Sequence, residues 1–526
     1  MKKSVRSLLS IAVCLALSSS LLAGCGKGTS NEGTKTAATP AAGKEAPVTI
    51  KMFNRVNAQV VIENNPIIQE AEKLANVKIM LEAPPINNYV DKLQILMASG
   101  DIPDLVYNWG AAGNPADANL ETWAKNGLLA SLDDKISKYP NLTKNITKEM
   151  WDAVKSVNDG KTYAIPRTNV VNHWGYVINQ QWLDKLNLKA PTTLDEFTNV
   201  LKAFTTGDPD GNGKADTYGL TLSNPSLGAN TIWNSTYFIA SAFNLPIVNG
   251  VKDTDGNYKI REKMSGYIPY LTYLKSLNDQ KIIDPEFLIN KIDVDKDKAL
   301  QNRVGIIYGH QYAVMGLLAK DKEADKKFTY QPVLKDSKGV ATDLVTPAMW
   351  GGWMISKSSK NIDAVLKFLD WGNTAEANAL FQIGIKGLTY DSYDPATKKI
   401  SRTPDQAAKV ATLTSTYMTL ANAINGTGAI IENADNDDKM KKYQSDLDTA
   451  MKKVTVFNVP AVRAPKILNL NASLPDLVKK KDDYEVKFTV GDITLQQFKD
   501  FLEKEWYPAT ADAEKEYIDT MKKMGN

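Results

Sequence analysis

The sequence contains very little cysteine and histidine. Cys14, Cys25, His173 and His310 are the only residues of these two types in 526 positions. Both cysteines lie near the N-terminus, so the chain after Cys25 cannot form an internal disulfide, and its fold must be stabilised by its cores alone. A chain of about 500 residues can bury ample apolar surface and is expected to form at least two domains.

A charge excess is missing as well. The chain has 63 basic and 60 acidic residues. Three basic residues and no acidic residue precede Cys25, so the chain from Cys25 onward carries 60 of each sign. With no basic excess to neutralise phosphates, a nucleic-acid partner is not expected.

Sequence motifs of several enzyme classes are absent. The chain has no G-x-S-x-G elbow, no H-E-x-x-H zinc motif and no G-x-x-x-x-G-K-[ST] phosphate loop. A glycosidase needs two carboxylates that flank the scissile bond, and 60 acidic residues do not reveal such a pair. We therefore predict that the protein is not an enzyme, with an exported polysaccharide-cleaving enzyme as an open alternative.

The N-terminus has the layout of a secretory signal peptide. Basic residues precede a short apolar run over 8–17, and small residues lead to the tetrapeptide Leu-Ala-Gly-Cys that ends at Cys25. The apolar run is about half of the ~20 residues that a membrane-spanning helix needs. The tetrapeptide resembles a bacterial lipobox, in which the cysteine receives a diacylglycerol and becomes the first mature residue. The alternative is a signal peptide cut near Gly24, followed by an incidental cysteine.

These features predict a signal peptide over 1–24 and a lipidated cysteine with a flexible tether over 25–47. The stretch 26–47 has no aliphatic residue larger than alanine, so it cannot bury enough surface to fold. Flexible-coil statistics give this tether a reach on the order of 25 Å.

Strand and helix patterns alternate after the tether. Strands are expected at 48–53, 77–81 and 104–107, with helices at 65–74 and 89–99 between them. This alternation predicts a parallel sheet covered by helices.

A second α/β pattern follows. It starts with a strand at 170–179 and includes a helix that begins at a capping box formed by Thr193 and Glu196. A strand at 349–356 and a helix from Asn361 to Trp371 come later. The rest is predicted to be mainly helical, with a possible strand at Glu485–Val490.

Several segments in a fixed order resemble a known family. These are the lipobox and tether, KLQILMASGDIPDLVYN (92–108), GKTYAIPRT (160–168), RVGIIYG (303–309), GGWMISKSSKNIDAVLKFLDW (351–371) and EWYPA (505–509). Together they look like a family 1 extracellular solute-binding protein of an ABC importer, in the LipO-like, carbohydrate-binding branch of Gram-positive lipoproteins.

The resemblance implies an α/β, two-lobed fold of the periplasmic-binding-protein type that closes on ligand between the lobes. Hinge crossings are expected near Ile165–Thr168, Tyr330–Leu334 and Trp371–Ala375. Both lobes are then discontinuous. One consists of 48–166 plus 334–373, and the other of 167–333 plus 374–526, which includes a helical C-terminal extension.

The function implied is that of a membrane-anchored receptor. It captures a carbohydrate, with an oligosaccharide favoured, and delivers it to ABC permease subunits as a monomer on the extracytoplasmic face of the cell membrane. Two further alternatives keep the fold: a binding protein for a peptide or another polar solute, and a sensor that presents its ligand to a membrane kinase.

The segment 208–216 has the alternation of a calcium loop. Ca²⁺ prefers six to eight oxygen ligands, and an EF-hand supplies them at positions 1, 3, 5, 7 and 9 with glycine at position 6. The matching residues here are Asp208, Asp210, Asn212, the carbonyl of Lys214, and Asp216, with Gly213 in sixth place. The twelfth position is Gly219 instead of a bidentate glutamate, so we predict a structural Ca²⁺ site. A self-solvated Asp/Asn/Gly turn is the alternative, although it leaves three carboxylates close together.

Aromatic and polar residues near strand ends and crossings are candidates for ligand contact. Sugars offer apolar C–H faces and a rim of hydroxyls, so a sugar site pairs aromatic rings with polar side chains. A guanidinium would matter most for a uronic acid, because it can grip a carboxylate through two hydrogen bonds. Solvated surface positions and core positions are the alternatives for each residue. The candidates are Asn54, Arg55, Trp109, Arg167, Trp174, Trp233, Arg303, Trp350 and Trp353.

Overall fold

The computed structural model describes residues 46–524, apart from several short stretches. These stretches are 57–58, 85–87, 110–117, 169–172, 223–234, 247–248, 291–293, 311–312, 319, 346–348, 397–398, 416–417, 419, 421–433, 461 and 463. The predicted signal peptide, Cys25 and the tether up to residue 45 lie outside the described residues. All elements described below belong to one compact unit that begins at Pro47.

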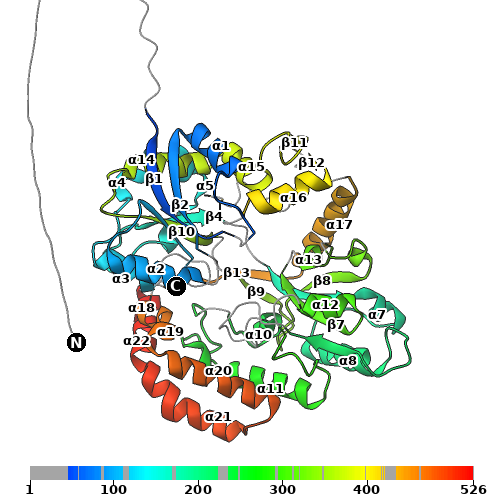
Figure 1. The fold of residues 1–526 in the computed structure, drawn as a ribbon. Coiled ribbons are helices and arrows are strands. Elements are labelled where there is room, and N and C mark those ends of the chain that lie inside the picture. Colours follow the sequence, from blue (N-terminus) through cyan, green and yellow to red (C-terminus); the bar gives the residue numbers. More distant parts are fainter. Residues whose placement is uncertain are drawn as a thin grey trace, which may run out of the picture. The chain divides into compact units, whose positions relative to one another are not determined.

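The first sheet has five strands in the order β2-β1-β3-β10-β4. Figure 1 labels β1, β2, β4 and β10 of this sheet. The five strands are β1 (Val48–Phe53), β2 (Val77–Glu82), β3 (Leu105–Asn108), β4 (Ala164–Thr168) and β10 (Met349–Ile355). The predicted parallel arrangement is confirmed for β1, β2 and β3. β10 is antiparallel to both β3 and β4, so a strand from far along the chain completes the sheet.

Capping signals in the sequence define the helix ends around this sheet. The side chain of Asn65 caps the first helix, and Pro66 occupies its first turn. The second helix ends at Gly100, as predicted, in the left-handed conformation with φ of 77°. The helices of this group are α1 (Pro66–Ala75), α2 (Tyr89–Ser99), α3 (Ala118–Lys125), α4 (Asp133–Ile136), α5 (Pro140–Asn145), α6 (Lys148–Ala153), α14 (Ile362–Gly372), α15 (Ala375–Ile383) and α16 (Pro404–Leu413).

The core of the first sheet includes residues that we assigned to the other lobe. Leu380 and Phe381 of α15, together with Leu420, share one buried cluster with Tyr107 and Trp353. The predicted crossing at 371–375 is therefore wrong, and so is the assignment of the stretch from 375 to 420 to the second lobe. The assignment followed the order of segments along the chain, whereas burial of these apolar side chains places the segment with the first sheet.

The second sheet has four strands in the order β6-β7-β5-β8. They are β5 (Trp174–Asn179), β6 (Tyr218–Thr221), β7 (Val304–His310) and β8 (Phe328–Pro332). β6 is parallel to β7, whereas β5 is antiparallel to β7 and β8. A shorter pair, β9 (Thr342–Val345) and β13 (Thr455–Asn458), is parallel, and β11 (Ser392–Asp394) pairs with β12 (Lys399–Ser401).

Helices before and after the second sheet pack with it. At α8 the predicted capping box of Thr193 and Glu196 is present. The α-helices of this group are α7 (Gln180–Lys185), α8 (Leu194–Thr206), α10 (Tyr237–Ala240), α11 (Tyr267–Asp279), α12 (Val294–Leu300), α13 (Ala313–Leu318), α17 (Ala434–Met451), α18 (Pro465–Leu468), α19 (Leu470–Ser473), α20 (Pro475–Val490), α21 (Leu495–Phe501) and α22 (Tyr507–Lys523). Shorter helical turns are η2 (Ser241–Phe243), η3 (Arg261–Lys263), η4 (Ala324–Lys326) and the π-helical η5 (Leu502–Trp506).

Two further predictions near the second sheet are wrong. Leu334 and Leu344 belong to its core, so the first lobe does not resume at residue 334. The possible strand at Glu485–Val490 is the end of α20, which packs on α11. Its β-branched and aromatic residues suggested a strand, but Glu485 is fully buried and pairs at helical spacing with Lys481.

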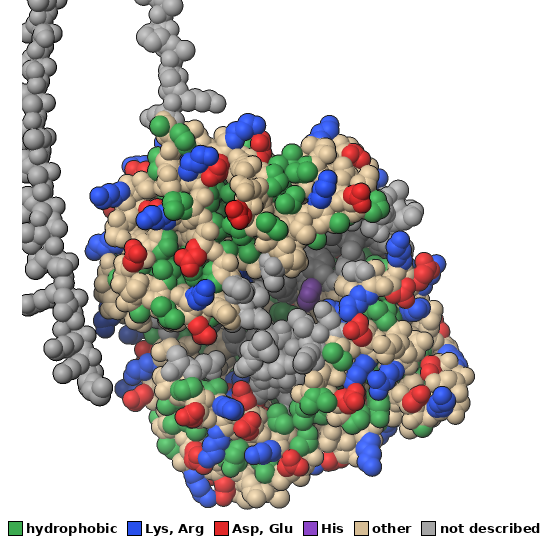
Figure 2. Space-filling model, viewed as in Figure 1, with side chains coloured by type: hydrophobic (Ala, Val, Ile, Leu, Met, Phe, Trp, Pro, Cys, Tyr) green, Lys and Arg blue, Asp and Glu red, His purple; other side chains and the backbone are tan. Residues whose placement is uncertain are grey.

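The surface agrees with the charge balance of the sequence. Basic and acidic side chains are interspersed over the face shown in Figure 2. Among the described residues, no helix is both long and apolar enough to cross a bilayer.

Candidate functional site

The structure brings four of the predicted residues together at one edge of the first sheet. Arg55 follows β1, Trp109 follows β3, Arg167 lies in β4 and Trp350 in β10. The Arg55 guanidinium carbon lies 3.3 Å from the centroid of the Trp109 ring, and that of Arg167 lies 5.4 Å from the Trp350 ring. The two indole rings meet edge to face at 5.1 Å. We call these four residues and Tyr107 the first aromatic cluster.

Tyr107 is the centre of this cluster. Its hydroxyl donates a hydrogen bond to the Trp350 carbonyl, and both guanidinium carbons lie 5.9 Å from its ring centroid. Gly351 makes this approach possible, because a Cβ there would lie 2.4 Å from the Tyr107 hydroxyl, and its φ of +81° is strained for other residues. The glycine after Trp350 thus allows a close backbone approach.

Burial divides the cluster into an inner and an outer part. Arg167 is fully buried and Arg55 is 7% exposed, whereas Trp109 and Trp350 are half-buried. Asn54, another candidate, is buried, and its side chain accepts a hydrogen bond from the Arg55 N–H. The indole rings are therefore the more exposed part of the cluster.

A second aromatic cluster lies at the edge of the second sheet. Trp174 stacks on Tyr308 with ring centroids 5.8 Å apart, and the edges of Tyr237 and His310 approach it at 6.3 and 6.1 Å. Trp174 starts β5 and His310 ends β7, and these two residues are partners in the antiparallel ladder. We call these four residues the second aromatic cluster.

Buried ionisable groups surround the second cluster. Burial, with a smaller contribution from Lys296, lowers the pKa of His310 to about 4, so this ring is neutral at neutral pH. Asp343 of β9 accepts a hydrogen bond from His173 Nδ1 over 2.9 Å. Burial raises the pKa of the Asp343 carboxyl, and the bond from His173 opposes that rise. A carboxyl group thus lies beside the second cluster, whereas the first cluster contains two guanidinium groups.

Short connections link the two clusters. Arg167 and Trp174 are seven positions apart in the chain, and so are Asp343 and Trp350. Seven extended residues span at most about 25 Å. The first connection joins β4 of the first sheet to β5 of the second sheet, and the second joins β9, which pairs with β13, to β10 of the first sheet. The chain itself therefore keeps the clusters within the length of an oligosaccharide.

Two of the described candidates do not join either cluster. Trp353 is fully buried in the first core, where its Nε1 donates to the Leu420 carbonyl over 2.8 Å. Arg303 is exposed and precedes β7, at the opposite end of the strand from His310. Trp233 lies outside the described residues.

The sequence analysis missed Tyr107, Tyr237, Tyr308, His310 and Asp343. Tyr308 and His310 alternate at the end of a strand, which was the available signal. Tyr237 and Asp343 reach the cluster from distant segments, so no local pattern could have indicated them.

The predicted calcium loop joins α8 to β6. The Asp208 carboxylate accepts hydrogen bonds from the backbone N–H groups of Gly211, Asn212 and Gly213, each over 3.1 Å. Desolvation acts to raise the pKa of this carboxyl, but these bonds lower it overall. Asn212 Nδ2 donates to Asp210 over 2.7 Å and to Asp216 over 3.1 Å.

The side chains of the loop carry oxygen atoms of the kind that a hard cation prefers. Within the described part of the chain, no group of three or more Asp, Glu, His or Cys side chains is gathered closely enough to hold a metal. Instead, the Asn212 amide occupies the point that Asp210 and Asp216 both face. The amide oxygen accepts a hydrogen bond from the Lys214 N–H over 2.7 Å, so rotation of the amide would exchange this bond for a third oxygen that faces the same point.

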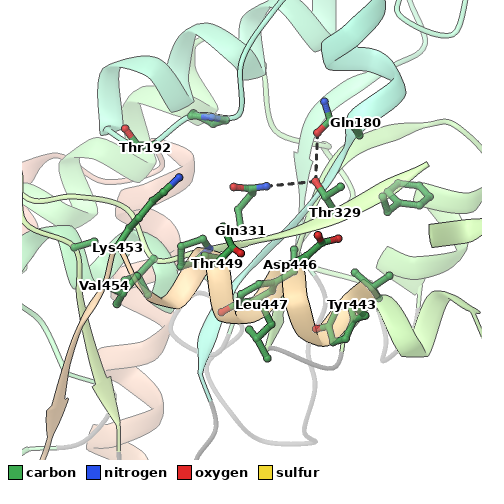
Figure 3. Close-up of a pocket in the computed structure, with 18 of the residues that line it drawn as sticks. Gln180, Thr192, Thr329, Gln331, Tyr443, Asp446, Leu447, Thr449, Lys453 and Val454 are labelled. Atoms are coloured by element: carbon green, nitrogen blue, oxygen red, sulfur yellow. Dashed lines mark hydrogen bonds between the residues drawn. The ribbon is translucent and has the colours of Figure 1, made fainter. Parts of the chain in front are cut away.

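A pocket of about 470 Å³ lies between β8 and α17 (Figure 3). Gln331 donates to Thr329 over 3.3 Å, and Thr329 donates to Gln180 over 3.5 Å. Tyr330 lines the pocket, and its hydroxyl donates to the Trp174 carbonyl over 3.1 Å. The pocket therefore borders the second cluster, although among the described residues none of the predicted ligand contacts lines it.

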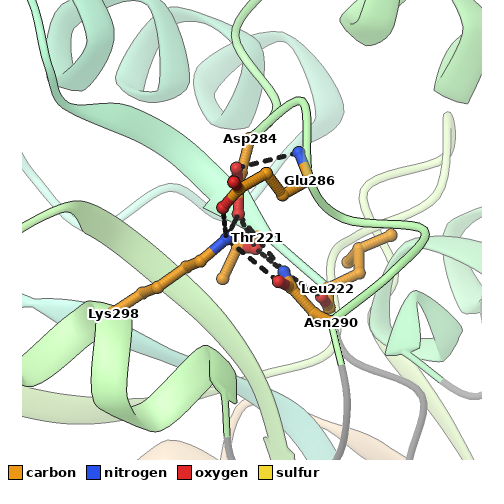
Figure 4. Close-up of polar contacts among 6 residues, drawn as sticks. All are labelled: Thr221, Leu222, Asp284, Glu286, Asn290 and Lys298. Carbon is orange, nitrogen blue, oxygen red and sulfur yellow. Dashed lines mark hydrogen bonds and ion pairs between the residues drawn. The ribbon is translucent and has the colours of Figure 1, made fainter.

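A buried polar network holds the end of β6 (Figure 4). Lys298 donates to Asp284 over 2.6 Å, to Glu286 over 2.7 Å and to Asn290 over 2.9 Å. Thr221, the last residue of β6, donates to the same Asp284 oxygen over 2.6 Å. Since Thr221 pairs with Ile307 beside Tyr308, the network anchors the sheet edge that carries the second cluster.

Comparison with known proteins defines the class. A family model for bacterial extracellular solute-binding proteins matches residues 62–379. The chain therefore belongs to this family, as its motifs suggested.

Particular relatives extend the match to nearly the whole chain. The polygalacturonan/rhamnogalacturonan-binding protein YtcQ of Bacillus subtilis is 27% identical over 504 residues, which cover 94% of both chains. Lipoprotein LipO of the same organism is 27% identical over 506 residues, covering 93% of this chain and 94% of LipO.

A solved structure confirms the two-lobed α/β fold. The ABC-transporter substrate-binding protein FusA of Streptococcus pneumoniae, in complex with kestose, is 21% identical with a TM-score of 0.65. The match covers 90% of this chain and 98% of FusA. A FusA EF-hand mutant in complex with fructo-nystose matches with a TM-score of 0.64.

Proposed function

We propose that this protein is the substrate-binding component of an ABC importer and captures a carbohydrate, most simply an oligosaccharide, without transforming it. The observation that carries the proposal is the pair of aromatic clusters at the edges of two sheets that short connections join. The relatives support it, since YtcQ binds polygalacturonan and rhamnogalacturonan and FusA binds kestose.

The chemistry of both clusters suits a sugar. Half-buried indole rings offer flat apolar surfaces to the C–H faces of pyranose rings, and the neighbouring Arg, Asn and His side chains can bond to hydroxyls. A ligand that contacts both clusters at once binds the closed arrangement better than an open one. It therefore shifts the population of the protein toward the closed arrangement.

The N-terminus supports attachment to the outer face of the cell membrane. In this proposal residues 1–24 are a signal peptide, and Cys25 carries the lipid that anchors a monomeric receptor beside its permease. The lipoprotein LipO, a relative over nearly the full length, is consistent with this arrangement.

A thermal-shift screen of the chain without its first 25 residues tests the function. A ligand at 100 times its Kd adds about 2.7 kcal/mol of stability, which for ~480 residues raises the Tm on the order of 2–3 °C. We expect such a rise with oligosaccharides, and chromatography of the same samples should show the glycans uncleaved. A rise with peptides alone would overturn the ligand class, and cleavage products would favour the enzyme alternative.

We also propose that the 208–216 loop binds Ca²⁺ as a structural ion. A cation between Asp210 and Asp216 would neutralise carboxylates that the Asn212 amide now bridges. The existence of a FusA EF-hand mutant is consistent with a loop of this type in a protein of the same fold.

Calcium removal is expected to lower the Tm of the wild-type protein by several degrees, and re-addition of Ca²⁺ should restore it. Asp210→Ala should abolish the difference between the calcium-loaded and chelated samples. Asp255→Ala is the matched control, because Asp255 lies in a similar Asp-Gly-Asn turn but pairs with Lys259, so this variant should keep the full calcium response. A wild-type Tm that does not respond to chelation would exclude the site.

A further inference from the structure

We infer that the pocket between β8 and α17 is a groove that binds an extended peptide segment of a partner protein. The peptide adds as a strand to the open edge of the second sheet, and an acidic residue of the peptide lies beside Lys335 and Lys453. The groove is separate from the proposed glycan site, because no residue of either aromatic cluster lines it.

The pocket follows the outer edge of β8 instead of one face of the sheet. β8 is the last strand in the order β6-β7-β5-β8, so its other edge is not paired within this sheet. Every residue of β8 lines the pocket, although successive side chains of a strand point to opposite faces. A cavity that contacts all of them lies beside the strand, where it meets the backbone.

The register of β8 shows which backbone groups face the pocket. The Gln180 N–H donates to the Lys327 carbonyl over 2.8 Å, and in an antiparallel ladder the hydrogen-bonded pairs recur at every second residue. Thr329 and Gln331 therefore use their N–H and C=O groups in the ladder with β5. The residues that alternate with them turn their backbone groups to the outer edge.

These outward residues are Phe328, Tyr330 and Pro332. Proline has no N–H, and in strands it is found at such unpaired edge positions. In the described part of the chain, no residue bonds to the backbone N–H or C=O of Phe328 or Tyr330 on this side. These groups are the donors and acceptors that an added strand would use.

α17 forms the opposite wall of the groove (Figure 3). Tyr443, Leu447 and Ala450 line the pocket at helical spacing, so they belong to one face of this helix. When a peptide adds to a sheet edge, main-chain hydrogen bonds provide affinity and pockets for alternate side chains provide specificity. The apolar face of α17 provides such pockets, and the volume of about 470 Å³ is typical of ligand sites.

Two lysines give one end of the groove a positive charge. Lys335 pairs with Ala341 in an isolated bridge, and the Ala341 carbonyl accepts from Thr455, two residues after Lys453. Both lysines therefore lie at the same end, and both line the pocket. In Figure 3 the Lys453 side chain extends over the pocket toward Gln331. A carboxylate of the peptide would meet these ammonium groups.

The other charges of the groove fit this direction. Asp325 precedes β8 and so lies toward the opposite end, and Asp446 pairs with Lys442 over 2.5 Å. Antiparallel pairing is more stable per residue than parallel pairing. In that arrangement the amino end of the peptide lies at the end of β8, beside the lysines, so the acidic residue belongs at the amino end.

Calorimetry with blocked peptides tests the charge. The probe is Ac-Asp-Thr-Val-Thr-NH2, and its partner has Asn in place of Asp. The acidic peptide should bind about 3-fold more tightly, which is the size of an exposed ion pair. The double variant with Lys335→Gln and Lys453→Gln should lose this preference. Lys452→Gln is the control, because Lys452 is exposed and does not line the pocket.

Backbone methylation of the probe tests the strand. A strand directs the N–H groups of adjacent residues to opposite sides. Two probes, N-methylated at the first Thr or at the Val, should therefore differ. One should bind like the parent, and the other should bind about 10-fold or more weakly, because it loses a hydrogen bond and a methyl group obstructs the edge.

A larger side chain on α17 tests the location. Ala450→Phe fills the groove and should weaken peptide binding about 10-fold or more, while binding of a hit from the glycan screen stays unchanged. Ser445→Phe is the matched control, because Ser445 is exposed on the same helix and does not line the pocket. If Ala450→Phe does not fold, the methylated probes with wild-type protein still decide the question.

Several results would overturn the inference. They are the absence of peptide binding at about 1 mM, equal affinities of the two methylated probes, and full peptide affinity in Ala450→Phe. Displacement of the peptide by a glycan would overturn it as well, since the peptide would then occupy the glycan site. Failure of every glycan to bind would instead contradict the proposed function and leave the groove standing.

Discussion

Lys298→Met is expected to destabilise the protein by about 3 kcal/mol, because it leaves the buried Asp284 carboxylate without its cationic partner. Asp284 is 1% exposed and accepts the Lys298 hydrogen bond over 2.6 Å. Its remaining donors, Thr221, Asn290 and the backbone N–H of Glu286, compensate in part. This loss corresponds to a fall in Tm of about 3 °C if ~480 residues unfold together, and to more if the second sheet unfolds separately.

Scanning calorimetry measures this effect, and Lys504→Met is the control. Lys504 pairs with Asp500 one helical turn away on an exposed face, so its removal should produce no resolvable change in Tm. An equal fall in the two variants would contradict the role of the buried network.

Acidification gives a second test of the same network. Burial acts to raise the pKa of the Asp284 carboxyl. The hydrogen bond from Lys298 and several weaker ones oppose this effect and lower the pKa below its ordinary value overall. A lowered pKa contributes stability that is fully present above the ordinary value and is lost as the pH falls through the folded value. The difference in Tm between wild type and Lys298→Met should therefore be largest near neutral pH and narrow below about pH 4.

Trp353→Ala is expected to cost about 4 kcal/mol of stability, whereas Trp350→Ala should act mainly on ligand affinity. Trp353 is fully buried, and its removal leaves a large cavity and the Leu420 carbonyl without its donor. Trp350 is half-buried at the edge of the sheet. Loss of its ring should weaken oligosaccharide binding about 10-fold or more with a much smaller change in Tm.

The two tryptophans can be compared in one experiment, because they lie in the same strand. Calorimetry gives the Tm of each variant, and titration of a hit from the glycan screen gives its affinity. Trp353→Ala with normal stability, or Trp350→Ala with unchanged affinity, would contradict the division between core and ligand surface.

Local signals in the sequence predicted much of the fold. The capping box at Thr193, the glycine after α2 and the alternation of strands and helices each depend on neighbours in the chain. The boundaries of the lobes depend on long-range burial, which is why the stretch from 375 to 420 was misplaced. The strand prediction at Glu485–Val490 is wrong for a related reason. Glu485 forms a buried ion pair with Lys481 one helical turn away, and this contact favours a helix over the strand that the residue types predict.

In the candidate site, too, local signals predicted some of the residues, while others depend on long-range packing. Arg55, Trp109, Arg167 and Trp350 were indicated because strand ends in α/β sheets gather at one edge. The sequence could not separate Trp350 from Trp353, which differ by three positions but point to opposite environments. Which side of a strand faces the core is decided by the sheet that forms around it.

The position of β10 has a consequence for the order in which the protein matures. β3 and β4 meet only through β10, yet β4 ends at Thr168 and β10 ends at Ile355. At typical rates of synthesis of about 5–20 residues per second, roughly 10–40 s pass between the two. All four strands of the second sheet are made within this interval, so that sheet can assemble first. Meanwhile β3 and β4 present open hydrogen-bonding edges of the kind that promote aggregation. The first sheet therefore waits for a strand from the second half of the chain, and the core of the second sheet waits longer still, because it includes Phe488 of α20 and Trp506 of η5.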